Sequence, residues 1–137
     1  MAKKKVLFLC TNNSCRSQMA EGLLRHMAGE DFEVSSAGTH PTHVNEYAIK
    51  AMAEVGIDIA EQRSKSLGKF MDEDFDCVIT VCDSARTLCP VFPGDGEKLH
   101  WDIPDPAGAG DTEEDILAGF RRVREMLAEK IKSTFCG

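Results

Sequence analysis

Four short apolar segments along the chain predict β-strands. Each has four to seven residues and is bounded by polar or turn-forming positions, which is typical of strands buried inside a sheet. The segments cover residues 5–9, 32–37, 75–81 and 98–101. The first runs directly into the polar sequence Cys-Thr-Asn-Asn-Ser, so we expect a strand that feeds a turn at Cys10.

The segments between these strands carry apolar residues at the three-to-four spacing of amphipathic helices. One helix is predicted from Ser17, whose hydroxyl is suited to cap its amino terminus, and its core-facing residues are Met19, Ala20, Leu23, Leu24 and Met27. A second helix is capped by Asn45 and stopped by Gly56, and its apolar stripe is Ala48, Ala51, Met52 and Val55.

Three further helical segments are predicted. Residues 67–71 form a short helix, and residues 84–88 form a helical turn that ends at Pro90. Thr112 opens a long final helix, because three acidic residues that favour a helix amino terminus follow it. The core-facing residues of this helix are Ile116, Phe120, Val123, Leu127 and Ile131.

The alternation of strands and helices indicates an α/β fold. Crossover helices join parallel strands, so we expect a three-layer sandwich with a central four-stranded parallel sheet flanked by helices. A length of 137 residues suits a single domain, residues 1–137. Ligands of such sheets gather at the carboxyl ends of the strands. Cys10, Cys82 and the loop at residues 102–105 are therefore expected at one edge.

The net charge of −7 changes the range of expected partners. An acidic chain is poorly suited to nucleic acid or to an anionic membrane surface. The apolar run at residues 6–10 is shorter than an export signal requires, and no stretch has the length of a membrane span. We therefore expect a cytoplasmic monomer without nucleic-acid or membrane partners.

The chain contains six cysteines, which is notable for a cytoplasmic protein. Structural disulfides are rare in that compartment, so reactive thiols become more plausible. The cysteine spacings do not match a zinc site, and no histidine pair has metal-ligand spacing. We expect no metal site, buried thiols at Cys15 and Cys77, and an exposed thiol at Cys136.

The segment from Cys10 to Ser17 has the character of an oxyanion-binding loop. A loop between a strand and a helix can point successive backbone N–H groups at a tetrahedral anion, and the helix adds the positive end of its dipole. Arg16 offers a planar fork for two anion oxygens, and the Ser17 hydroxyl can donate to the Cys10 sulfur. These features favour a thiolate at Cys10. The predicted anion-binding residues are Thr11, Asn12, Asn13, Ser14, Cys15, Arg16 and Ser17.

A less specific interpretation of these residues stays open at this point. Cys10 and Arg16 also fit a buried cysteine followed by a helix with an exposed arginine. Within the loop, Asn12 and Asn13 tolerate the left-handed backbone of a tight cup.

This loop resembles the active-site loop of low-molecular-weight protein tyrosine phosphatases and of their relatives, the thioredoxin-coupled arsenate reductases. The sequences Ser-Ala-Gly-Thr at 36–39 and Asp-Pro-Ala-Gly at 105–108 resemble further signatures of the group. The resemblance runs from Lys4 to the last helix. It implies a low-molecular-weight phosphatase-like fold.

Asp105 takes its expected role from this resemblance. The general acid of the group sits in such an Asp-Pro motif, where it protonates the oxygen that leaves when the cysteine attacks. An aspartate in a turn is also common without any function, and Asp102 is the nearby competitor.

Cys82 and Cys89 distinguish the two activities of the group. A phosphatase needs one cysteine, whereas reduction of arsenic(V) needs further thiols that accept the oxidation. The segment from Thr80 to Pro90 resembles the redox segment of the thioredoxin-coupled reductases. The resemblance implies a relay from Cys10 to Cys82 to Cys89, which must bend the intervening chain because seven helical residues rise about 10.5 Å.

The expected function is therefore reduction of arsenate to arsenite, for arsenic detoxification, with catalytic residues Cys10, Arg16, Ser17, Cys82, Cys89 and Asp105. No bound cofactor is expected, and reduced thioredoxin is the implied electron donor.

Some relatives hold potassium beside the loop, but Lys65 replaces an expected carboxylate, and we hypothesise that its ammonium replaces the ion near Glu21 and Asn13. A phosphotyrosine phosphatase is the alternative, weak phosphatase side activity is compatible with the reductase, and a non-enzymatic thiol sensor is a third possibility.

Overall fold

A four-stranded parallel sheet forms the centre of the molecule. The computed structural model describes residues 3–82, 94, 96–106 and 110–136, with Cys82 described by its backbone alone. The strand order is β2-β1-β3-β4, and all three pairs are parallel. The strands are β1 (Lys4–Cys10), β2 (Phe32–Gly38), β3 (Cys77–Cys82) and β4 (Glu97–Asp102).

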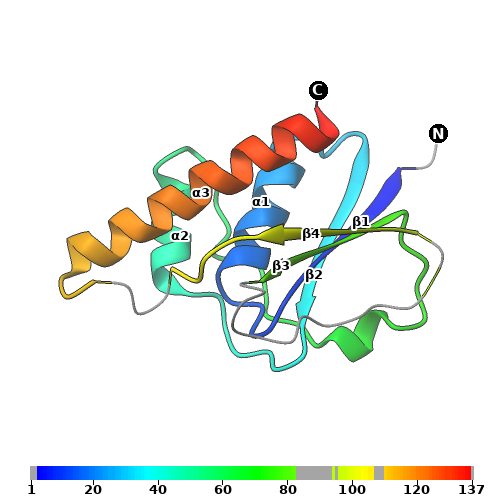
Figure 1. Ribbon diagram of the computed structural model, residues 1–137, viewed down its shortest axis with the longest axis horizontal. Helices are drawn as coiled ribbons and strands as arrows, with labels where there is room; N and C mark the ends of the chain where they lie inside the picture. Colours follow the sequence, from blue (N-terminus) through cyan, green and yellow to red (C-terminus); the bar gives the residue numbers. More distant parts are fainter. Residues whose placement is uncertain (1–2, 83–93, 95, 107–109, 137) are drawn as a thin grey trace.

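Within the described residues, three α-helices and one 3₁₀-helix accompany the sheet (Figure 1). The long α3 runs across α1 and α2 on one side of the molecule. Their bounds are α1 (Arg16–Ala28), α2 (Glu46–Ala53), α3 (Glu113–Phe135) and the 3₁₀-helix η1 (Leu67–Phe70).

The alternation of side chains along the strands gives the sheet two apolar faces. Val6 and Phe8 of β1 share the larger core with residues of the three α-helices, and the Phe8 ring packs against Trp101 with centroids 5.8 Å apart. Leu7 and Leu9 face the other way, into a smaller cluster with Phe70 of η1. The expected α/β fold with a central parallel sheet between two layers is confirmed.

Of the three helix caps predicted from the sequence, two are present in the structure and one is not. The Asn45 side chain accepts from Tyr47 N at 2.8 Å, and the Thr112 hydroxyl accepts from Asp115 N at 3.1 Å, so both predicted caps are confirmed. Ser17 is not a cap: α1 begins one residue earlier, at Arg16, and its N-cap residue, Cys15, makes no side-chain cap bond. The Ser17 hydroxyl instead bonds within the loop.

Two predicted core residues lie at the surface. Met27 is 37% exposed because it lies in the last turn of α1, and Val55 is 45% exposed because α2 ends at Ala53, before it. The helical turn predicted at 84–88 lies outside the described residues. Among the helices that the structure describes, none is both long enough and apolar enough to cross a bilayer.

Candidate active site

The loop after β1 curves around a small cavity at the carboxyl edge of the sheet. The cavity has a volume of about 190 Å³ and is lined by Asp105 and by every residue from Cys10 to Arg16 except Asn13. Strand β1 lies between β2 and β3 in the sheet, so the cavity opens where the central strands end. The convergence predicted from topology for Cys10 and Asp105 is therefore present.

The loop carbonyls are held on the side away from the cavity. Thr11 O accepts from His40 N at 2.9 Å, and Ser14 O accepts from Asn45 N at 2.9 Å. Asn12 O accepts from the Ser64 hydroxyl at 2.9 Å, and Asn13 O accepts from the Gln18 side chain at 3.0 Å.

Four consecutive carbonyls thus bond to residues behind the loop. In a trans peptide the C=O and the following N–H point in opposite directions, so the N–H groups of residues 12, 14 and 15, all of which line the cavity, turn toward it. Asn13 permits the tight curve with a φ of 49°, whereas Asn12 has no positive φ. The arrangement is the ring of donors that a tetrahedral anion requires.

The Cys10 sulfur lies at the edge of this ring with a hydroxyl beside it. Cys10 Sγ and Ser17 Oγ are 2.8 Å apart, and both residues are buried. Asn13 Nδ2 donates to Ser17 Oγ at 2.7 Å. Since Ser17 Oγ accepts from Asn13, its own hydrogen is available for the sulfur, which stabilises a thiolate.

Arg16 and Asp105 join the loop to the end of β4. Arg16 donates through Nη1 to the Ile103 carbonyl at 2.9 Å, and its Nη2 lies 3.9 Å from Asp105 Oδ2. The Asp105 side chain is about half exposed, whereas Arg16 is buried. A cation and a carboxylate therefore face the same cavity as the Cys10 thiol, as the sequence predicts.

Of the other described cysteines, Cys15 is buried and Cys136 is exposed. Cys15 is buried, and burial raises the pKa of its thiol to about 11, so it stays protonated near neutral pH. Cys136 is exposed near the end of the chain. Both placements agree with the sequence prediction. Cys82 ends β3 and pairs with Asp102 in the backbone register, and Cys89 lies outside the described residues.

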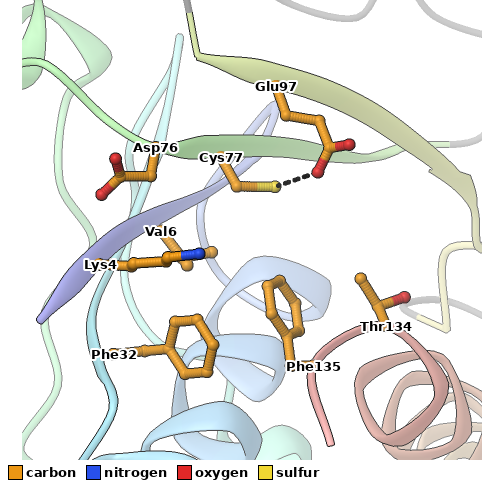
Figure 2. A pocket seen from close by; sticks show the side chains of 8 residues that line it. All are labelled: Lys4, Val6, Phe32, Asp76, Cys77, Glu97, Thr134 and Phe135. Carbon is orange, nitrogen blue, oxygen red and sulfur yellow. Dashed lines mark hydrogen bonds between the residues drawn. The ribbon is translucent and has the colours of Figure 1, made fainter. Parts of the chain in front are cut away.

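A larger cavity, about 490 Å³, lies at the opposite edge of the sheet (Figure 2). Its lining includes the Cys77 thiol, which points toward Glu97 on the neighbouring strand, with Phe32 and Phe135 below. Burial and then the Glu97 carboxylate raise the pKa of Cys77 to about 11. A thiol in that protonation state is a poor nucleophile, so the smaller cavity at Cys10 is the candidate site.

Lys65 lies behind the loop, beside the buried carboxylate of Glu21. Its Nζ is 3.5 Å from Glu21 Oε1 and donates to the Arg63 carbonyl at 2.7 Å, while its backbone N–H donates to Asn13 Oδ1 at 2.7 Å. Burial lowers the pKa of Lys65, and the Glu21 charge partly opposes that effect. An oxygen of Glu21 and the side-chain oxygen of Asn13 thus both have Lys65 as a partner. Among the described residues, no three His, Cys, Asp or Glu side chains gather as a metal would need.

Sequence reasoning missed two residues that shape the loop. Gln18 is fully buried and holds the Asn13 side chain, although its position on α1 gave no sign of this. Gly38 is the other: a Cβ atom there would overlap the carbonyl oxygens of Thr11 and Cys10. The Ser-Ala-Gly-Thr signature pointed to this position but not to the contact.

Comparison with known proteins finds a family and relatives to which this chain is similar over nearly its whole length. A family model described as low molecular weight phosphotyrosine protein phosphatase matches residues 5–135. An arsenate reductase of Halalkalibacterium halodurans is 46% identical over 133 residues, covering 97% of this chain and 96% of the relative.

Solved structures show the same likeness. An arsenate reductase in the phosphate binding state is 37% identical with a TM-score of 0.82, covering 95% of each chain. A thioredoxin-dependent arsenate reductase of Corynebacterium glutamicum is 29% identical with a TM-score of 0.65, covering 96% of this chain and 63% of that one.

Proposed function

The chain belongs to the low molecular weight phosphotyrosine protein phosphatase family, and we propose that it is an arsenate reductase that converts arsenate to arsenite with Cys10 as nucleophile. Two of the compared relatives are arsenate reductases that match nearly the whole chain. The observation that carries the proposal is the sheet order: β1 and β3 are neighbours, and they end in Cys10 and Cys82.

In the first step arsenate enters the donor ring, with Arg16 binding two of its oxygens. The Cys10 thiolate attacks arsenic, forming a sulfur–arsenic(V) bond. Asp105 supplies the proton with which one arsenate oxygen leaves as water. The 2.8 Å contact of Ser17 with the sulfur supports the attacking thiolate.

The relay then moves two electrons from thiols to arsenic. The Cys82 thiolate attacks the Cys10 sulfur, so a disulfide forms, the sulfur–arsenic bond breaks, and its electron pair leaves with arsenic as arsenite. The Cys89 thiolate attacks the Cys82 sulfur, which releases Cys10 as a thiolate and leaves a Cys82–Cys89 disulfide. Both exchanges require a thiolate attacker.

The backbone register brings residues 10 and 82 close together, but residue 81 is the one level with residue 10 and side chains alternate along a strand, so the first exchange also requires the end of β3 to turn. Leu9 pairs with Thr80, so Cys82 lies one residue beyond the position level with Cys10 on the neighbouring strand. Neighbouring strands are about 4.8 Å apart and each residue rises about 3.3 Å, which gives a Cα separation of about 6 Å. Disulfides form at Cα separations of about 4.4–6.8 Å.

The electron donor in this proposal is thioredoxin, whose dithiol reduces the Cys82–Cys89 disulfide and becomes oxidised. One similar structure is of a thioredoxin-dependent arsenate reductase, which supports this choice. The cycle needs a compartment in which thiols stay reduced, and the bacterial cytoplasm meets that requirement.

We further propose that the enzyme works without potassium, because the Lys65 ammonium stands beside Glu21. The Lys65 backbone N–H, rather than its ammonium, bonds to Asn13. The hypothesis drawn from the sequence placed the Lys65 ammonium near both Glu21 and Asn13. In the structure the Lys65 side chain lies beside Glu21, and its backbone N–H donates to Asn13.

A phosphatase acting on phosphotyrosine is the second candidate, favoured by the family to which the chain belongs. It would use Cys10, Arg16 and Asp105 in the same cavity and would give the thiols of residues 82 and 89 no task. Weak hydrolysis of aryl phosphates is compatible with the reductase, because both anions fit the same ring of donors.

The deciding experiment follows arsenate-dependent oxidation of NADPH in the presence of thioredoxin and thioredoxin reductase. The reductase predicts turnover in the wild type that is lost in Cys10→Ser, Cys82→Ser and Cys89→Ser, because each variant removes one sulfur of the relay. Cys136→Ser is the matched control, since this exposed thiol is not in the relay, and it should keep full turnover.

The same variants are assayed for hydrolysis of p-nitrophenyl phosphate. No arsenate-dependent turnover in the wild type, combined with hydrolysis that survives in Cys82→Ser and Cys89→Ser, would identify a phosphatase instead.

A further inference from the structure

Gln18 is a polar side chain inside the core, which is unusual for a glutamine. Its Nε2 donates to Asn13 Oδ1 at 2.9 Å, to Asn13 O at 3.0 Å and to the Arg63 carbonyl at 2.8 Å. The two backbone carbonyls can only accept, so Nε2 must be the atom on this side. The orientation of the Gln18 amide is thereby determined.

The Asn13 amide is determined in the same way. The Lys65 backbone N–H donates at 2.7 Å to the atom that also accepts from Gln18, and a backbone N–H can only donate. That atom is therefore the Asn13 oxygen, and its nitrogen must face Ser17. The Ser17 hydroxyl, which accepts from Asn13, keeps its hydrogen for the Cys10 sulfur.

This series of hydrogen-bonded side chains continues beyond Gln18, away from the Cys10 sulfur. Gln62 Nε2 donates to Gln18 Oε1 at 2.7 Å and to the Gln18 backbone carbonyl at 3.1 Å, which determines the Gln62 amide as well. Arg25 Nη1 donates to Gln62 Oε1 at 3.3 Å. In this series each side chain from Arg25 onward donates to the next one on the way to Cys10, and hydrogen bonds aligned in one direction strengthen one another.

We propose that Gln18 is a positioning residue for Cys10: together with Gln62 it holds the Asn13 amide so that Ser17 donates to the sulfur, and thereby stabilises the thiolate. The inference rests on the proposed role of Cys10 as nucleophile. Gln18 contacts neither the anion cavity nor the sulfur, so it acts only through Asn13 and Ser17.

Other ionisable groups surround both ends of this series. Arg16, Asp105 and Cys15 line the cavity with Cys10, and Glu21 and Lys65 lie at the far end with Arg25. All of these groups stay unchanged in the variants below. A shift in the pH midpoint of Cys10 alkylation therefore reports on the series of amide hydrogen bonds.

The test measures the rate at which iodoacetamide alkylates Cys10 over a pH series, with the modified residue located by peptide fragmentation. In Gln18→Met the midpoint of the pH profile is expected to rise by about one unit, the effect of weakening a hydrogen bond to a charged sulfur. Asn13→Gly, which removes the donor to Ser17 without adding a charge and tolerates the positive φ at this position, is expected to raise it at least as far.

Leu23→Ala is the matched control, because it removes buried packing from the same helix without touching the amides. Its midpoint is expected to stay at the wild-type value. An unchanged midpoint in Gln18→Met, or an equal rise in Leu23→Ala, would overturn the inference.

If Gln18→Met does not fold, Gln62→Met replaces it. The midpoint is then expected to rise by a smaller amount, and an unchanged midpoint would count against the inference. Alkylation needs no arsenate, so this result is independent of the proposed reduction. Absence of arsenate turnover in the wild type would refute the function while leaving the midpoint comparison intact.

Discussion

Lys65 is the residue whose ammonium we propose in place of a bound ion. Its ammonium is mostly buried beside Glu21, where burial lowers its pKa and the carboxylate counters that effect. Glu21 also accepts from Ser36 and Arg25, so its oxygens are already surrounded by donors. A buried carboxylate needs such partners, because an unpaired charge in the interior is costly.

At the residue scale, exchanging sodium for potassium should leave activity unchanged. This follows from the proposal that the Lys65 ammonium, 3.5 Å from Glu21 Oε1, takes the place of an ion there. Arsenate turnover is compared in the two salts at constant ionic strength, with sulfate absent because it competes for the donor ring. A several-fold rise in potassium would show that Lys65 does not replace the ion.

At the element scale, a cluster of ion pairs joins α2 to α3. Glu54, just after α2, accepts from Arg121 Nη2 at 2.7 Å and from Arg124 Nη1 at 2.9 Å. Hydrogen bonds from these arginines lower the pKa of Glu54 to about 2. Arg124 also donates to the Ala51 carbonyl at 2.7 Å, so it binds the carboxyl end of α2 directly.

The Glu54 cluster predicts a pH-dependent contribution to stability. Because the pKa is lower in the folded protein than its ordinary value of 4.5, the contribution is present above pH 4.5 and disappears as the pH falls toward 2. Glu54→Gln should lower the thermal midpoint by a few degrees at neutral pH, as for other exposed ion pairs.

Thermal unfolding of both proteins, followed by circular dichroism, provides the measurement. The difference between them should shrink between pH 4.5 and 2 and should not grow. Glu61→Gln, an exposed change on a separate loop, serves as the control. A difference that is constant down to pH 2 would exclude the proposed ion pairs as its cause.

At the scale of the whole molecule, the loop keeps its shape because several distant segments bond to its outer side. His40, Asn45, Ser64 and Lys65 lie beyond α1 in the sequence, yet each donates to the loop. Gly38, at the end of β2, lets the two backbones approach closely.

Gly38→Ala should therefore disable the site while leaving the fold intact. The new Cβ would overlap the carbonyl oxygens of Thr11 and Cys10 and push the loop outward. A misplacement on the order of 1 Å can reduce turnover about 100-fold. Gly68→Ala is the matched control, since its Cβ would meet only Ser66 Oγ, at 3.6 Å. Equal turnover in the two variants would contradict the close approach at Gly38.

Much of the fold could be predicted because it depends on local patterns. The four apolar segments became the four strands, with ends that differ by at most two residues from those expected. The caps at Asn45 and Thr112 were readable because each side chain bonds to the backbone two or three residues later. The predictions failed at Ser17 and Val55, where a loop bond and an early helix end overrode the local pattern.

The site was predicted less completely, and for a physical reason. Cys10 and Arg16 could be named because their chemical types and their place after a strand suggest an oxyanion site, and Asp105 could be named because its Asp-Pro motif resembles that of the family's general acid. Gln18 could not, because a glutamine on a helix is ordinarily exposed, and only the packing of α1 against the segment at 62–65 makes it a buried donor.

The sequence alone determined which atoms are available: a thiol after a strand, a chain of backbone donors, an arginine and a carboxylate, with further cysteines after the next strand. Only the tertiary structure decided where the donors point, because the carbonyls of residues 11–14 turn outward through bonds to segments distant in sequence. Hydrogen-bond direction depends on partners in space, and such partners cannot be read from local spacing.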